Sequence, residues 1–170
     1  MKKSLGRAFL FSLFVFLALT FLFFIIGYSV AGVLDNVLDD IAAHPTHSVY
    51  LFVYPSQYLP WEQVINSIDA LTLGFKIFYF GGLISFAIAA IVAGIFGGGV
   101  GKSIGGWILT VICSSILYII IISIDDFNLN YISFTATLID GIITIIIASV
   151  VNLLLFGVIV IIITLIAGRS

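Results

Sequence analysis

The chain has 170 residues, of which 62% are hydrophobic and only 8% charged, and its formal net charge is −2. A soluble domain carries about 25% charged residues, so this composition excludes a water-soluble globular protein and predicts an all-α integral membrane protein. The basic residues are too few and too scattered for a nucleic-acid-binding protein, and the single cysteine, Cys113, excludes an intrachain disulfide.

Four apolar segments are long enough to span a bilayer, whose core of ~30 Å needs about 20 apolar residues in a helix. They cover approximately residues 8–34, 77–96, 106–124 and 142–167. We therefore expect a single membrane domain over residues 1–170, built as a four-helix bundle with an outer loop at 35–76.

The charges sort to opposite sides of these spans. If the N-terminus lies inside the cell, five of the six basic residues lie on the cytoplasmic side, and Lys76 is the exception. The five are Lys2, Lys3, Arg7, Lys102 and Arg169. Because Lys and Arg favour the cytoplasmic side, the sequence predicts a multi-pass protein of the plasma membrane with both termini cytoplasmic.

The first span has an alternative interpretation as a signal sequence. A basic start precedes it, and Ser29, Val30 and Ala31 resemble a cleavage site. The apolar stretch is longer than the 7–15 residues of a signal-peptide core, so we expect it to remain as a transmembrane helix.

The outer loop contains a pattern typical of a short amphipathic helix. Pro60 suits the first turn, and apolar residues recur at steps of three and four from Trp61 to Leu71. We expect this helix to lie on the outer membrane surface or to cap the bundle. The aromatic residues Tyr50, Tyr54, Tyr58 and Trp61 suit the headgroup region, and the stretch "SVYLFVY" is either a short extended segment or a buried apolar loop.

A weak metal-binding pattern lies in the same loop. His44 and His47 are the two histidines of the chain, and Asp39 and Asp40 are close in sequence. Imidazole and carboxylate groups are suitable ligands for a divalent cation. Against this, Pro45 interrupts the spacing and no supporting pattern is visible.

The stretch "GGGVGKS" between the second and third spans could be a phosphate-binding loop or a turn. A phosphate-binding loop needs glycine five residues before its Gly-Lys pair, and that position is Phe96. We therefore expect a glycine turn and no nucleotide binding.

Small residues recur at every fourth position in the second span and point to a helix-packing contact. The pattern leaves open whether the contact lies inside the bundle or against a second subunit. The residues are Ser85, Ala89, Ala93 and Gly97; Gly101 and Gly105 continue the spacing but are expected in the turn.

Strongly polar residues are rare in the spans. Asn152 lies deepest and is expected to hydrogen-bond to a neighbouring helix, whereas Asp140 precedes the fourth apolar run and suits the outer interface.

The sequence contains no recognisable catalytic set and no cofactor motif. We expect a non-enzymatic accessory or scaffold subunit of a larger membrane complex, in contact with lipid and with other subunits or copies of itself. The alternatives are a small homo-oligomeric channel or solute transporter, and a membrane enzyme or metal-binding subunit that uses the outer histidines and acids.

Overall fold

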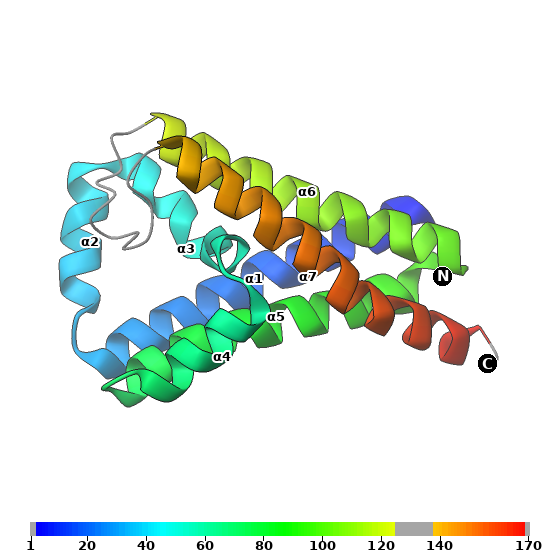
Figure 1. The fold of residues 1–170 in the computed structure, drawn as a ribbon, viewed down its shortest axis with the longest axis horizontal. Coiled ribbons are helices and arrows are strands. Elements are labelled where there is room, and N and C mark those ends of the chain that lie inside the picture. Colours follow the sequence, from blue (N-terminus) through cyan, green and yellow to red (C-terminus); the bar gives the residue numbers. More distant parts are fainter. Residues whose placement is uncertain (1–2, 125–137, 169–170) are drawn as a thin grey trace.

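The computed structural model describes residues 3–124 and 138–168, and this part of the chain is helical throughout its regular structure (Figure 1). The elements in chain order are α1 (Leu5–Ala31), α2 (Leu34–Ala43), the 3₁₀ turn η1 (Pro45–Val49), α3 (Tyr50–Val53), the 3₁₀ turn η2 (Tyr54–Gln57), α4 (Pro60–Asp69), α5 (Leu73–Gly97), α6 (Val100–Ile124) and α7 (Leu138–Ala167).

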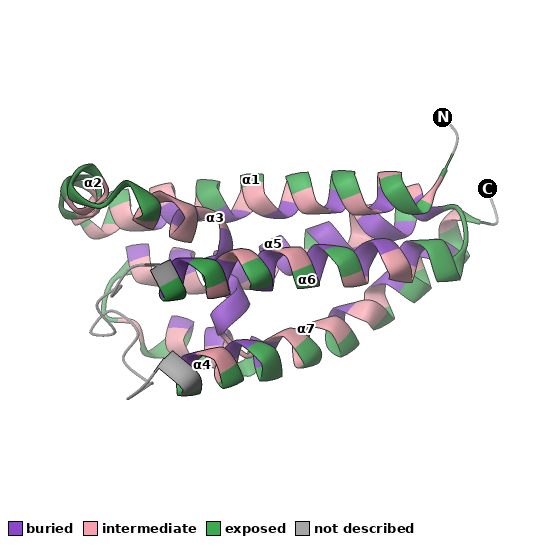
Figure 2. Ribbon diagram, turned by 90° about the horizontal axis from the view of Figure 1, so that it is seen from above, coloured by how far each residue is buried: buried purple, intermediate pink, exposed green. Residues whose placement is uncertain are grey.

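Four of these helices, namely α1, α5, α6 and α7, are long and apolar enough to cross a membrane. They form a bundle in which both chain ends and the α5–α6 connection lie at one end, here named the terminal end (Figure 1). Helix α2 and the segment that follows it lie toward the opposite end, here named the loop end. Exposed residues lie on the outer sides of the long helices (Figure 2), and many of them are large and hydrophobic.

The helix ends differ from the predicted spans for local reasons. The first helix ends at Ala31 and not near residue 34, because Gly32 adopts a left-handed conformation with φ 73° and its N–H donates to the carbonyl of Ser29. The second span begins at Leu73, where the Thr72 side chain accepts a hydrogen bond from the N–H of Phe75.

The predicted glycine turn is confirmed, but it is shorter than expected. Gly98 and Gly99, with φ values of 76° and 158°, make the whole connection between α5 and α6. Gly101 and Gly105 were expected in the turn and instead belong to α6, which begins at Val100. Ser103 on α6 donates to the carbonyl of Gly94 at 3.4 Å and holds the two helix ends together.

One aromatic side chain from each long helix fills the centre of the terminal half. The rings of Phe16 and Phe86 lie 4.7 Å apart, and Phe156 stacks on Phe86 at 5.6 Å. Trp107 meets Phe86 edge-on at 6.1 Å and donates its indole N–H to the carbonyl of Leu153. The four rings are almost completely buried and form one aromatic cluster.

The small-residue positions of the second span point into this core. Ser85, Ala89 and Ala93 are 0% exposed and Gly97 is buried. Ser12 on α1 donates to the carbonyl of Ala89 at 2.9 Å. These side chains are therefore covered by the chain's own helices.

A close contact between the backbones of α1 and α5 occurs elsewhere, at Gly27 and Gly74. A Cβ atom on Gly74 would lie 2.7 Å from the Cβ of Ala31, and closer still to the carbonyl oxygen of Gly27. A Cβ on Gly27 would lie 2.9 Å from the Gly74 carbonyl oxygen. Only glycine permits the two backbones to touch at this crossing.

The segment from α3 through η2 to Tyr58, here named the fold-back segment, folds back between the long helices. Val53 and Tyr54 are at most 1% exposed, and the Tyr54 hydroxyl donates to the carbonyl of Phe78 at 2.7 Å. Asn152, fourteen residues into α7, donates to the carbonyl of Tyr58 at 3.3 Å. At 1.5 Å per residue this contact lies ~21 Å from the start of α7, so the segment reaches the middle of the bundle. The stretch "SVYLFVY" is thus buried and helical.

Helix α4 has the predicted start at Pro60, and its orientation is the reverse of that of a helix on a soluble domain. Its buried residues include Gln63 and Ser67, whereas Trp61, Ile65 and Ile68 are 52%, 53% and 68% exposed. Gln63 donates to the carbonyl of Pro55 at 3.3 Å. The polar face therefore contacts the bundle and the apolar face points away from it.

Candidate functional site

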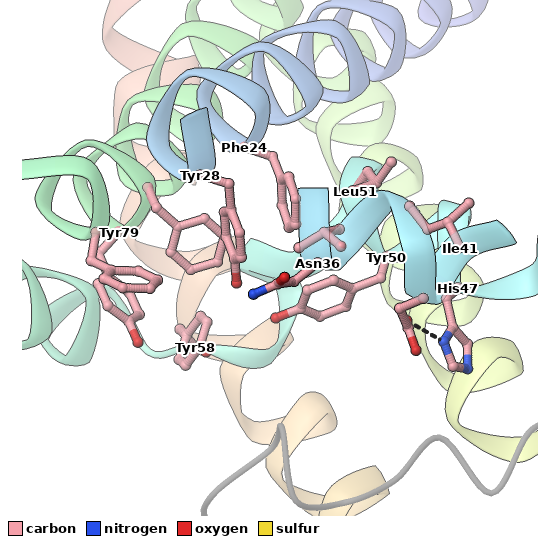
Figure 3. Close-up of a pocket in the computed structure, with 13 residues that line it drawn as sticks. Phe24, Tyr28, Asn36, Ile41, His47, Tyr50, Leu51, Tyr58 and Tyr79 are labelled. Carbon is pink, nitrogen blue, oxygen red and sulfur yellow. Dashed lines mark hydrogen bonds and ion pairs between the residues drawn. The ribbon is translucent and has the colours of Figure 1, made fainter. Parts of the chain in front are cut away.

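A cavity of about 110 Å³ lies at the loop end, between the fold-back segment and the ends of α1 and α5 (Figure 3). Its lining is mainly aromatic, with a few polar side chains on one side. The lining residues are Phe24, Tyr28, Asn36, Val37, Asp40, Ile41, His47, Tyr50, Leu51, Tyr58, Phe75, Phe78 and Tyr79.

Ring contacts hold the aromatic wall in place. Phe24 and Tyr28, one helical turn apart on α1, stack at 4.2 Å. Tyr58 meets Tyr79 edge-on at 5.6 Å. Tyr50 lies edge-on to Phe24 at 6.0 Å. Because these rings come from α1, α3, α5 and the end of η2, the wall forms only when the fold-back segment is seated in the bundle.

The tyrosine hydroxyls of the fold-back segment remain neutral. Burial raises the pKa of Tyr50, and the nearby hydroxyl of Tyr28 raises it further. Burial likewise raises the pKa of Tyr58, with a smaller contribution from Tyr50. These groups therefore contribute dipoles and ring faces, not charge.

Helix α2 closes the cavity with one of its faces. Asn36, Val37, Asp40 and Ile41 line it at the spacing of neighbouring turns. The helix has no fully buried residue. In Figure 3 the amide of Asn36 lies between the hydroxyl ends of Tyr28 and Tyr50.

The charged part of the lining is a carboxylate–imidazole pair. Nδ1 of His47 lies 2.7 Å from Oδ2 of Asp40. The His47 side chain is 11% exposed and the Asp40 side chain 40% exposed, so the carboxylate marks the mouth of the cavity. The lining residues include no lysine or arginine.

The predicted metal ligands are brought together only in part. Asp40 pairs with His47, and His44 stacks on His47 with ring centroids 4.9 Å apart. Asp39 is exposed, and among the described residues no three His, Cys, Asp or Glu side chains form a group that could hold a metal ion. Asp125 and Asp126, a pair of acids that follows the third apolar span and was a further predicted source of metal ligands, lie outside the described residues.

The two polar residues predicted in or near the fourth span do not line the cavity. Asn152 is 0% exposed; its amide nitrogen binds the Tyr58 carbonyl, and its Oδ1 has no partner among the described residues. Asp140 is exposed in the first turn of α7, where its carbonyl accepts from Thr144.

The placement of the tyrosines corrects the sequence-based interpretation. Tyr50 and Tyr58 line the cavity and Tyr54 is 1% exposed, so these three do not form an outward-facing aromatic belt; Trp61 alone of the four is exposed. The repeat of tyrosine at every fourth residue from 50 to 58 was the available signal, since it places the rings on one helical face.

Comparisons with family models, with curated proteins and with solved structures found no match. The site is therefore interpreted from its own geometry. Neutral phenols, aromatic faces and one carboxylate held by an imidazole are groups suited to binding a ligand.

Proposed function

We propose that this chain is a non-enzymatic multi-pass protein of the plasma membrane that serves as an accessory or scaffold subunit of a larger membrane complex. The observation that carries this proposal is the close packing of side chains between the long helices. One ring from each long helix packs in the terminal half, and the fold-back segment packs between the helices in the loop half, beside the cavity described above.

Hydrogen bonds across the bundle support a rigid body. Tyr54 binds the backbone of α5, and Asn152 of α7 binds the backbone at Tyr58. Tyr118 of α6 donates its hydroxyl to Gln57. Three long helices are thus joined through one inserted segment, an arrangement suited to presenting fixed outer surfaces to other subunits.

The alternative function, a homo-oligomeric channel or transporter with Ser85 to Gly97 as its subunit contact, receives less support. Those positions are covered within the chain, and the bundle centre is occupied by packed side chains.

The proposed orientation places the terminal end in the cytoplasm. Lys3, Arg7 and Lys102 belong to that end, whereas Asp35 and Asp69 belong to the elements of the opposite end. Single cysteines in a Cys113→Ala background test this with a membrane-impermeant maleimide on intact cells. Asp69→Cys should be labelled and Gly101→Cys should be labelled only after permeabilisation; the reverse result would overturn the orientation.

The complex is tested by extracting the chain from its native membrane in mild detergent and measuring the intact mass. Foreign subunits in fixed stoichiometry are expected. A homo-oligomer that carries ion or solute flux in liposomes would refute the accessory function, and turnover by the purified chain would refute its non-enzymatic character.

A further inference from the structure

We infer that the cavity at the loop end binds an organic ammonium group, in a methylated form such as that of choline. This inference goes beyond the proposed function, because it concerns a ligand of this chain alone and does not require a partner subunit. Its basis is the combination of enclosing aromatic side chains with a carboxylate at the mouth.

The charge of the lining selects a cation. Asp40 is a carboxylate, His47 orients it at 2.7 Å, and the lining residues include no lysine or arginine. An anionic ligand would lose its hydration without gaining a positive partner. The ring faces add to the attraction, since a cation within about 6 Å of an aromatic centroid is held by the negative face of the ring.

The size of the cavity limits the ligand to a small group. A cavity of about 150 Å³ accommodates benzene, so the 110 Å³ present here suits roughly five non-hydrogen atoms. A trimethylammonium group with its attached carbon has that size. A sugar ring with its hydroxyl groups is about twice as large.

The walls also select against a bare metal ion. Hard divalent cations need six or more oxygen ligands, whereas this lining offers one carboxylate and is otherwise dominated by rings and aliphatic side chains. A methylated ammonium ion sheds its water more easily and is held by ring faces without directed ligand bonds.

The mouth of the cavity is placed for a ligand that arrives from the loop end. Asn36 is exposed and Asp40 is 40% exposed, while Tyr58 and Phe78 line the cavity further inside the bundle. The ammonium group could belong to a free solute or to a lipid headgroup, since both present the same chemistry.

The test uses the purified full chain in micelles of a maltoside detergent, with choline as the probe and 3,3-dimethylbutan-1-ol as its uncharged isostere. Calorimetry should show saturable binding of choline, with affinity for the isostere weaker by roughly tenfold or more. Equal affinities would overturn the inference, because they would show an apolar cavity without selection for charge.

Two neighbouring acids on α2 supply a matched pair of variants. Asp40→Asn should weaken choline binding by roughly tenfold, whereas Asp39→Asn, at an exposed position outside the lining, should leave it unchanged. Equal losses would overturn the inference. Val37→Phe fills the cavity without removing a polar group and should abolish binding even if Asp40→Asn fails to fold; unchanged binding in that variant would also overturn it.

A second arm distinguishes the source of the ammonium group. The chain is incubated with equal amounts of phosphatidylcholine and phosphatidylglycerol of matched acyl chains, and retained lipid is read by native mass measurement. Selective retention of phosphatidylcholine that Val37→Phe removes supports a headgroup ligand, and binding of free choline alone supports a solute. Binding of neither would refute the inference.

Discussion

A glycine-to-alanine substitution should change the free energy of unfolding very differently at the tight α1–α5 contact of Gly27 and Gly74 than at an open position of a helix. We predict that Gly74→Ala destabilises the bundle, because the new Cβ would lie 2.7 Å from the Cβ of Ala31 and closer to backbone atoms that cannot rotate away. The clash is removed only if α1 and α5 move apart. Phe78 would move with α5, since its backbone is part of the same contact with Gly27.

The magnitude follows from two opposing terms. Overpacking of this kind costs about 3 kcal/mol at the upper end of the usual range. The gain in helix propensity from alanine is below about 1 kcal/mol, because Gly74 is the second residue of α5. The net loss is about 2 kcal/mol, or roughly a thirtyfold shift in the folding equilibrium.

The matched control is Gly157→Ala in α7. A Cβ at that position meets no atom within 4 Å, so only the propensity term applies. We expect it to be neutral or to stabilise the protein by about 0.5–1 kcal/mol.

The measurement is unfolding by SDS from mild-detergent micelles, followed by the emission of Trp107 in a Trp61→Phe background. Gly74→Ala should unfold at a lower SDS fraction than the parent, and Gly157→Ala at an equal or higher fraction. The reasoning is refuted if Gly74→Ala matches the parent, or if the two variants lose the same free energy.

Three further predictions use similar measurements. Tyr54→Phe removes the buried hydroxyl that donates to Phe78 at 2.7 Å and should lower the free energy of unfolding by about 1 kcal/mol; no change would contradict the seating of the fold-back segment. Asn152→Leu removes the hydrogen bond to the Tyr58 carbonyl, together with an amide oxygen that has no partner among the described residues. Because the carbonyl loses this donor, the variant should lose about 1 kcal/mol of unfolding free energy, whereas Asn152→Asp should cost about 3 kcal/mol or more by burying a charge. Acrylamide should quench the emission of Trp61, which is 52% exposed, and spare that of Trp107, which is 0% exposed; comparison of Trp61→Phe with Trp107→Phe measures this, and equal quenching would show that the aromatic core is open.

The apolar spans were predictable because the peptide N–H and C=O groups of a long uncharged segment have no water to bond to and must hydrogen-bond to one another. In a bilayer each peptide group must be satisfied internally, so length and composition alone specify a helix. The start of α4 at Pro60 and the turn after Gly97 were also predictable, because each depends only on nearby residues. Proline restricts the backbone angles of its own turn, and glycine permits angles that other residues avoid.

The periodicity of α4 leaves open which way its apolar face points, because a helix on the membrane surface and a helix that caps the bundle have the same pattern. A hydrophobic face normally points toward the protein because water lies outside. Trp61, Ile65 and Ile68 point outward here, while Gln63 donates to the Pro55 carbonyl and Ser67 is buried, with its hydroxyl bonded to its own helix. The sequence carries the same periodicity in either case; only the surrounding medium and the docking surface decide its direction.

The candidate site was the least predictable feature, because its parts are distant in the chain. The sequence supplied tyrosines at every fourth residue and an aspartate near a histidine. Whether the tyrosines face headgroups or a cavity depended on the fold-back segment, which is held by contacts such as Asn152 to Tyr58 across 94 residues. By itself the sequence determined four apolar helices and their approximate extents, since those follow from backbone hydrogen bonding within each segment. The tertiary structure alone decided the cavity, because its walls come from α1, α2, η1, α3, α5 and the residue that follows η2, which meet only after the bundle has closed around its own loop.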